Sequence, residues 1–226
     1  KKSSNINYMF FSKNTTILAL LSGCLLTLSW PVSGLSFLIF FGLIPLLLLE
    51  HIISNDQKKR KKIRLFGNAF LCFFIWNLGT TWWIINSSVF GMFFAVICNT
   101  LFYTILILVF NWSKRRLPLR TAYIFLVTLW ISFEKFHLQW DFSWPWLNLG
   151  NVFSEDIQWI QWYEYTGIFG GSLWILIINI GVFEVLKNYP PNFKNSTWIV
   201  KLSPWLIDIA LPIVISLIIY PSEKNT

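Results

Sequence analysis

The chain alternates between long apolar runs and short polar segments along its 226 residues. A helix needs roughly 17 to 25 mostly apolar residues to cross the hydrocarbon layer of a membrane, and most of the runs approach that length. The runs predict transmembrane helices over residues 15–30, 35–49, 65–85, 89–112, 121–138, 170–186 and 204–220. We therefore expect an all-α polytopic membrane protein with about seven transmembrane helices.

Residues 139–169, between the fifth and sixth predicted spans, form a segment of a different kind. It is too polar to cross a membrane, and its Trp-Pro-Trp motif at 144–146 suits the membrane–water interface, where one edge of an indole stays wet. Ser154 is a favourable N-cap, and the acidic residues at 155–156 would lie in the first helical turn. We expect a long external loop that contains a short helix lying on the membrane surface, with Gly167 allowing a sharp turn into the next span.

The composition agrees with lipid as the solvent of these helices. Hydrophobic residues make up 55% of the chain and charged residues only 12%, about half the usual charged share of a soluble domain. A soluble core of this size could not bury so much apolar surface, whereas side chains that face lipid do not need burial.

The basic residues give the predicted orientation. Lysine and arginine gather in the N-terminal segment and in every second loop, which are residues 1–13, 58–64, 114–120 and 187–201. Only Lys135 and Lys224 lie elsewhere. Because basic loops stay in the cytoplasm, the N-terminus is predicted to be cytoplasmic and the C-terminus periplasmic in a bacterial inner membrane. The net charge of +8 does not indicate nucleic acid as a partner, because that would need a basic face on a folded domain.

The sequence lacks a recognisable catalytic or metal-binding motif. His51 and His137 are predicted at opposite ends of the bundle, and Cys24, Cys72 and Cys98 lie in apolar runs without a Cys-x-x-Cys pair. A Gly-x-Ser-x-Gly motif, a phosphate-binding loop and a His-Glu-x-x-His motif are all missing from the sequence. We expect neither a metal nor a cofactor, and we assign no catalytic residue in this chain.

A few polar residues lie at or near membrane depth, where charge is costly and often functional. Glu134 has either a functional role or a simple pairing with Lys135 at the outer interface. Glu164 is either functional or a solvated residue of the surface helix. Asn99 and Asn179, in the middle of predicted spans, are expected to hydrogen-bond neighbouring helices.

From residue 134 onwards the chain resembles the apolipoprotein N-acyltransferase family. The motifs that carry the resemblance are Glu134 in WISFEKF, WPWLNLGNVF at 144–153, Gln161, Glu164-Tyr165-Thr166-Gly167, and Gly-Ser-x-Trp with a later Asn at 171–179. Ser29-Trp30-Pro31, Trp82-Trp83 and Phe90-Gly91 agree with the same family. The resemblance therefore covers essentially the whole chain.

The resemblance implies an architecture larger than this chain. Similar proteins have a membrane half, then a periplasmic nitrilase-like domain with a Glu-Lys-Cys triad, and then a final span. The cysteine takes an acyl chain from a phospholipid as a thioester and passes it to the free amine of a diacylglyceryl-cysteine lipoprotein. This chain does not begin with methionine, so we expect a fragment. Residues 221–226 are expected to begin the linker to a missing domain, and the chain alone is expected to be inactive.

The resemblance also implies a task for the membrane half, which is to anchor and position lipid substrates at the outer face of the inner membrane. A cleft between spans, open sideways to lipid, is expected on the same basis. Trp146 is the first choice for contact with lipid or substrate, and Glu134 and Glu164 are the expected polar anchors. The other positions that match the family motifs are Trp144, Pro145, Asn148, Gly150, Tyr165, Thr166 and Gly167. The expected partners are membrane lipids, a phospholipid acyl donor and a diacylglyceryl lipoprotein acceptor.

Two other classes of protein remain open. A stand-alone membrane binding or scaffold protein would keep the lipid-presenting half without the enzyme. A small transporter is less favoured, because transporters usually carry ionisable groups near the bilayer centre and often contain repeats.

Overall fold

The computed structural model describes residues 14–31, 34–57, 59–141, 143–188 and 197–223, and in these ranges every regular element is a helix. The α-helices are α1 (Thr15–Leu28), α2 (Ile39–Gly42), α3 (Ile44–Asn55), α4 (Lys61–Thr81), α5 (Val89–Ser113), α6 (Leu119–His137), α7 (Tyr163–Asn188) and α8 (Thr197–Glu223). Short 3-10 helices lie between them: η1 (Ser36–Leu38), η2 (Trp82–Asn86), η3 (Pro145–Leu147), η4 (Leu149–Phe153) and η5 (Ile157–Trp159).

Within the described ranges, five helical stretches are long and apolar enough to cross a membrane. They are Ser36–Asn55, Lys61–Asn86, Val89–Ser113, Tyr163–Asn188 and Thr197–Tyr220. The other two predicted spans also form helices, but α1 has only 14 residues and α6 contains three charged residues. The all-α polytopic membrane fold is thus confirmed, and the total of seven crossings stays a prediction.

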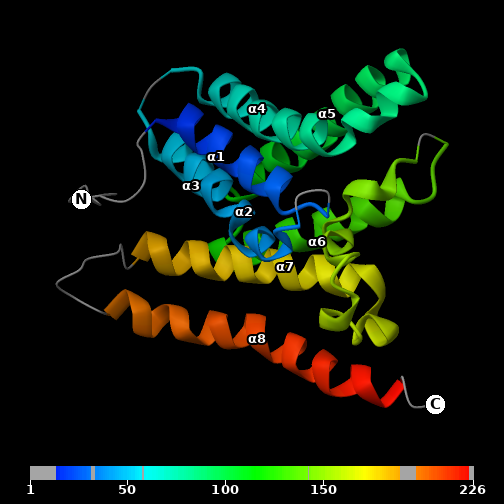
Figure 1. The fold of residues 1–226 in the computed structure, drawn as a ribbon. Coiled ribbons are helices and arrows are strands. Elements are labelled where there is room, and N and C mark those ends of the chain that lie inside the picture. The colour runs from blue at the N-terminus through cyan, green and yellow to red at the C-terminus, as the bar shows by residue number, and fades with distance from the viewer. Residues whose placement is uncertain (1–13, 32–33, 58, 142, 189–196, 224–226) are drawn as a thin grey trace.

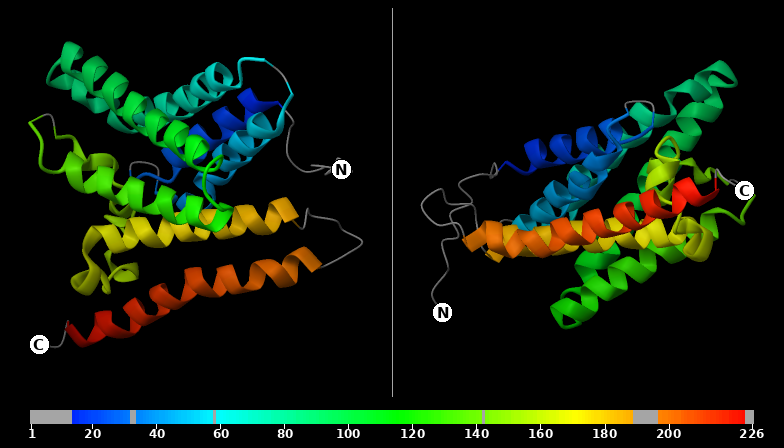
Figure 2. Two further views of the ribbon diagram at one scale, coloured as in Figure 1. Left: turned by 180° about the vertical axis from the view of Figure 1, so that it is seen from behind. Right: turned by 60° about the horizontal axis from the view of Figure 1, so that its bottom comes forward.

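The bundle has two chemically different ends. Figure 1 shows α4 and α5 as an antiparallel pair, and Figures 1 and 2 both show α7 and α8 running side by side. We call the end where α3 and α5 finish and α4 and α6 begin the basic end, because it carries the lysine and arginine clusters. The opposite end, formed by η2 and residues 139–162, is the loop end.

Several helices extend beyond the apolar runs that predicted them. At the basic end, α3 continues to Asn55 and α4 already begins at Lys61. Lysine and arginine are good helix formers whose long stems reach water, so they end an apolar run without ending the helix. Helix α8 likewise runs to Glu223, through part of the predicted linker, and residues 224–226 lie outside the described ranges.

The predicted surface helix after Ser154 does not form. Ser154 is the C-terminal cap of η4, and η5 is a single 3-10 turn. Asp156 accepts a hydrogen bond from the hydroxyl of Ser36, so a long-range contact uses the side chain that was expected in the first turn of a helix. Helix α7 then begins at Tyr163, which shortens the predicted loop 139–169 to residues 139–162.

An aromatic core lies beneath the loop end, between α4, α5 and α6. Trp76 and Trp130 are almost completely buried, and Tyr103 lies between them with ring centroids 5.0 and 5.2 Å away. Phe73 also packs on Tyr103, at 5.4 Å. Large flat rings fill this space with few conformational degrees of freedom, and they form a rigid base for the residues above them.

Asn179 of α7 bridges a break in the second predicted span. In a continuous helix the amide of Leu43 would donate to the carbonyl of Ile39. Here Leu43 N donates to Asn179 Oδ1 (2.8 Å), while Asn179 Nδ2 donates to Ile39 O (2.9 Å). The amide group thus satisfies both backbone groups at the junction of α2 and α3, and the predicted interhelical role of Asn179 is confirmed. Asn99 is also buried, but its Oδ1 has no hydrogen-bond partner among the described residues.

Replacing Asn179 with alanine is expected to lower the free energy of unfolding by about 1–2 kcal/mol, the range found for polar contacts between membrane helices. Thermal or denaturant unfolding of the full chain in detergent measures this loss. Asn99→Ala is the matched control, since it removes a buried asparagine whose Oδ1 makes no hydrogen bond in the described ranges. Equal losses in the two variants would contradict the bridging role.

Candidate functional site

Glu134 anchors the loop end to α6 from a completely buried position. Its exposed fraction is 0%, and its Oε1 accepts hydrogen bonds from Trp130 Nε1 (3.1 Å) and from the backbone N of Leu149 (2.8 Å). No ion pair joins Glu134 to Lys135 within the described ranges. The interpretation of Glu134 as a simple surface pair with Lys135 is therefore wrong. The carboxylate instead holds the segment that follows the Trp-Pro-Trp motif.

Side chains from three helices bind the backbone of residues 147–150. Tyr103 of α5 donates its hydroxyl to the carbonyl of Leu147 (3.1 Å). The amide of Gly150 donates to Ser172 Oγ of α7 (3.0 Å), and its carbonyl accepts from the hydroxyl of Tyr163 (3.2 Å). Together with Glu134, these contacts fix the junction of η3 and η4, whose backbone groups would otherwise be buried without partners.

Two predicted site residues are glycines because of the backbone they require. A Cβ atom on Gly150 would lie 2.2 Å from the carbonyl oxygen of Ile168, so only glycine lets the segment approach α7 this closely. Gly167 has φ 64° and ψ −173°, which interrupts the regular conformation of α7 and favours glycine over residues with a side chain. The predicted sharp turn at Gly167 is confirmed.

Trp146 and Trp144 extend from this fixed segment toward other aromatic residues. The Trp146 ring is 41% exposed and packs edge-on against Trp83 of η2, with centroids 5.3 Å apart. Trp144 packs edge-on against Phe94 of α5 at 5.8 Å. Pro145 between them begins η3. The motif therefore joins η2 and α5 into one aromatic surface at the loop end.

A hollow of about 360 Å³ lies beside Trp146, and we call it the loop-end hollow. Its lining comes from the end of α1, the α4–η2 junction and the segment after the Trp-Pro-Trp motif, and consists of Trp30, Pro31, Thr80, Thr81, Trp83, Trp146, Asn151 and Ser154. The described lining residues combine indole faces with hydroxyl and amide groups, and none of them is charged. Such a surface suits the neutral, ester-bearing part of an amphipathic molecule.

The predicted site residues separate into two groups. Trp146 lines the hollow, and Asn148, two residues further along the chain, is buried. Glu164, Tyr165 and Thr166 instead occupy the exposed first turn of α7, with Tyr165 81% exposed, and they do not line the hollow. The residues that match the family motifs therefore lie in two different places at the loop end, one at the hollow and one on the first turn of α7.

Sequence reasoning did not nominate several residues of this site. Trp30, Pro31 and Trp83 were noticed only as part of the resemblance, although their motifs lie at the predicted outer ends of spans. Thr80 and Thr81 gave no signal, because hydroxyl residues near a helix end usually bond the preceding turn, as these two do.

A second, apolar groove runs along the side of the bundle between α6, α7 and α8, with a volume of about 520 Å³. Its lining residues are Tyr123, Ile124, Val127, Thr128, Leu173, Ile177, Ile180, Gly181, Glu184 and Trp205. This groove is the feature that best matches the expected sideways cleft, and its lining is compatible with an acyl chain.

Within the described ranges, no group of three or more histidine, cysteine, aspartate or glutamate side chains is placed to hold a metal ion. Cys24, Cys72 and Cys98 are free thiols, and none of them lines the loop-end hollow. The described side chains that line the hollow offer indole faces and hydroxyl and amide groups, which can bind and orient a molecule.

The apolar helices and the anchored loop define a multi-pass helical membrane protein. Residues 22–181 match the family model described as the apolipoprotein N-acyltransferase N-terminal domain. The chain therefore belongs to the apolipoprotein N-acyltransferase family.

Two curated relatives agree with this assignment. An apolipoprotein N-acyltransferase from Chlorobaculum tepidum is 30% identical over 201 residues, which cover 87% of this chain and 36% of the relative. One from Geobacter metallireducens is 27% identical over 185 residues, covering 76% of this chain and 34% of the relative. The chain thus spans about a third of the length of each relative. No solved structure matches it.

Gly150→Ala is expected to destabilise the chain by about 1–3 kcal/mol, because the new methyl group must displace the backbone of Ile168. Limited proteolysis of residues 139–162 and thermal unfolding measure the effect. Gly67→Ala is the control, since nothing lies within 4 Å of its Cβ position and alanine favours a helix. A Gly150 variant as protected as the Gly67 variant would refute the close packing.

Glu134→Ala is expected to lower stability by about 2–3 kcal/mol, because it leaves the buried donors of Trp130 and Leu149 without an acceptor. Glu134→Gln keeps an acceptor oxygen and is expected to lose less. Thermal unfolding compares both with the exposed control Glu164→Ala, which should match the parent protein. Wild-type stability of Glu134→Ala would show that the carboxylate does not anchor the segment.

Proposed function

We propose that this chain is the membrane part of a lipoprotein N-acyltransferase and that it positions lipid substrates at the outer face of the inner membrane. Membership of the family supports the reaction class. In the complete protein, a cysteine thiolate would attack the ester of a phospholipid, forming a thioester and releasing a lysophospholipid. The amine of a diacylglyceryl-cysteine lipoprotein would then attack the thioester, forming an amide and freeing the thiol. The Glu-Lys-Cys triad for these steps belongs to the proposed nitrilase-like domain.

The observation that carries the positioning role is the attachment of Trp146. Its half-exposed ring borders the loop-end hollow, while the residues just after it are hydrogen-bonded to α5, α6 and α7. Both proposed substrates are anchored in the membrane, so their reacting groups lie at headgroup level. A rigid binding surface at that level supplies proximity and orientation, and these are large factors in catalysis.

We assign the loop end to the periplasm and the basic end to the cytoplasm. The lysine and arginine clusters before α4 and between α5 and α6 lie together at one end of the bundle, and the uncharged hollow lies at the other. The positive-inside rule supports this orientation. With this orientation, the hollow would lie in the leaflet where lipoproteins would meet a periplasmic catalytic domain.

Glu164 and Tyr165 have a separate proposed role, since they lie on the exposed first turn of α7 and do not line the hollow. We assign them to polar contact with the headgroup or with the lipoprotein acceptor. The fully buried Glu134 then acts as a positioning residue for the Trp-Pro-Trp segment.

Trp146→Ala, placed in the complete reading frame that contains this chain, is expected to lower N-acylation by about tenfold or more, because it removes a ring that orients the substrate. The assay follows the mass of a diacylated lipoprotein peptide as it gains a third acyl chain, and carbonate extraction confirms membrane insertion. Trp198→Ala is the matched control, because Trp198 is a partly exposed indole near the start of α8 and lines neither the loop-end hollow nor the cavity and groove at the basic end. Unchanged turnover in Trp146→Ala would remove this residue from the site.

A further inference from the structure

The basic end contains a cavity of about 380 Å³ that the proposed acyl transfer does not use. It lies where α3, α5 and α7 end and where α4 begins. Its lining residues are His51, Ile53, Ser54, Asn55, Lys61, Lys62, Leu65, Asn111, Lys114, Arg115, Leu119 and Lys187. Lysine and arginine side chains come from α4, α7 and the α5–α6 connection, and the described lining residues include no acidic side chain, so the cavity is suited to an anion.

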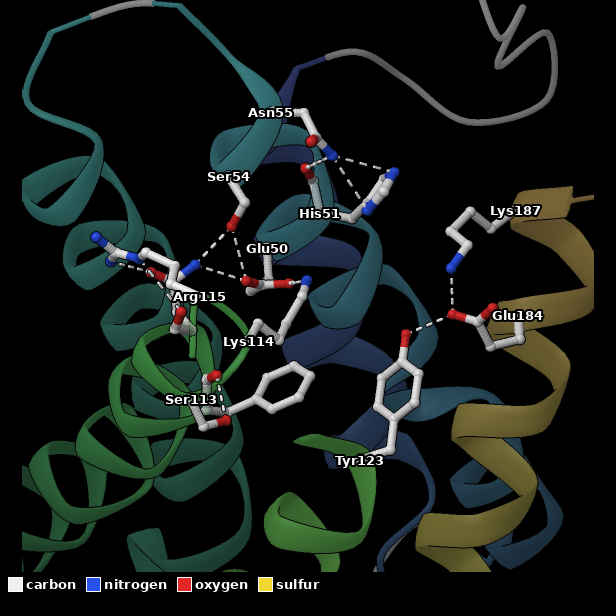
Figure 3. A network of polar contacts seen from close by, with 12 residues as sticks. Glu50, His51, Ser54, Asn55, Ser113, Lys114, Arg115, Tyr123, Glu184 and Lys187 are labelled. Atoms are coloured by element: carbon white, nitrogen blue, oxygen red, sulfur yellow. Dashed lines mark hydrogen bonds and ion pairs between the residues drawn. The ribbon is translucent and has the colours of Figure 1, made fainter. Parts of the chain in front are cut away.

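A buried carboxylate holds one wall of this cavity in place. Glu50 is 1% exposed and accepts hydrogen bonds from Asn111 Nδ2 (2.6 Å) and Ser54 Oγ (2.8 Å). It also forms an ion pair with Lys114 (2.5 Å). Figure 3 shows Glu50, Ser54 and Lys114 meeting between α3 and the end of α5. Since charge-assisted contacts away from water are strong, this wall is rigid.

Within the described ranges, some of the lysine and arginine side chains of the cavity have no acidic partner. The ion pairs within the described ranges join Lys114 to Glu50, Lys187 to Glu184, and Arg64 to Asp56. Lys61, Lys62 and Arg115 lack a carboxylate partner there, although Lys61 donates to the carbonyl of Ser54 and Arg115 to Asn111. The cavity therefore keeps an excess of positive charge.

The start of α4 adds to this charge. Helix α4 begins at Lys61, on the wall of the cavity, and its N-cap residue Arg60 has φ 63° and supplies no side-chain acceptor. The first amides of a helix carry a partial positive charge and favour anions, phosphates in particular. The first turn thus directs its dipole toward the same region as the unpaired lysines.

An apolar groove continues from the cavity. This groove between α4 and α5, of about 400 Å³, shares Lys62, Asn111 and Arg115 with the cavity. Its other lining residues are Ile63, Phe66, Leu108 and Trp112. Ile63 and Trp112 are 67% and 50% exposed, so these side chains face the surroundings of the bundle. Cationic and apolar surfaces therefore adjoin each other in the order found along a phospholipid.

We propose that the basic end binds one anionic glycerophospholipid, with its phosphate against Lys61, Lys62 and Arg115 and an acyl chain in the groove between α4 and α5. Charge complementarity selects the anionic headgroup. The adjoining apolar groove favours a lipid over a soluble phosphate. Basic residues that only attract anionic lipids nonspecifically would need neither the buried Glu50 contacts nor the adjoining groove. The proposed site lies at the opposite end of the bundle from the loop-end hollow.

The test compares two lipids with identical acyl chains on the purified full chain. Native mass spectrometry measures binding of phosphatidylglycerol and phosphatidylcholine, and the anionic lipid is expected to bind about tenfold more tightly. The double variant Lys62→Gln with Arg115→Gln is expected to abolish this preference. Lys59→Gln with Arg120→Gln removes the same charge from exposed residues at the same end that do not line the cavity, and it should retain the preference.

Three outcomes would overturn the proposal. An equal loss of preference in the two double variants would assign the effect to general surface charge. Displacement of phosphatidylglycerol by millimolar glycerol phosphate or inorganic phosphate would point to a soluble ligand. Equal binding of short-chain and long-chain phosphatidylglycerol would remove the groove from the site. If the Lys62→Gln, Arg115→Gln double variant unfolds, each single variant is compared instead. An unchanged preference for phosphatidylglycerol in both single variants would then contradict the proposal.

Discussion

The structure depends on supplying hydrogen-bond partners to backbone groups that leave a helix where water is scarce. In a membrane each such group must be satisfied by the protein itself. At the break between α2 and α3, the amide of Asn179 provides both a donor and an acceptor. At the loop end, Tyr103, Glu134 and Ser172 do the same for the segment after the Trp-Pro-Trp motif. Both irregular segments are therefore held by side chains from distant parts of the chain.

The dependence on distant side chains explains which predictions the sequence could support. Apolar runs predict helices well, because lipid requires long uninterrupted helices, and the structure differs mainly at the charged ends, where α3 and α4 extend farther. The sequence also identified Asn179 and the turn at Gly167. The prediction of a surface helix capped by Ser154 was wrong, because contacts such as that of Ser36 with Asp156 outweigh the local capping signals. Such contacts between distant residues cannot be predicted from the neighbouring sequence.

The candidate site shows the same division. The resemblance selected Trp146, which does border the loop-end hollow, but it also selected Glu164 and Tyr165, which lie on another surface. Thr80 and Thr81 become visible as lining residues only when α1, α4 and the loop are assembled. The two ends of the bundle differ in kind as well, since the hollow beside Trp146 is uncharged while the cavity beside Lys114 is lined by cations.

The attachment of residues 147–150 to three helices has a mechanical consequence. Because Tyr103, Glu134 and Ser172 each hold a different point of this short segment, its position depends on α5, α6 and α7 together. A shift of any one helix along its axis would pull on the segment and rotate the Trp146 indole with it. Changes in bilayer thickness, which alter helix tilt, would thereby be converted into movement of a single aromatic ring.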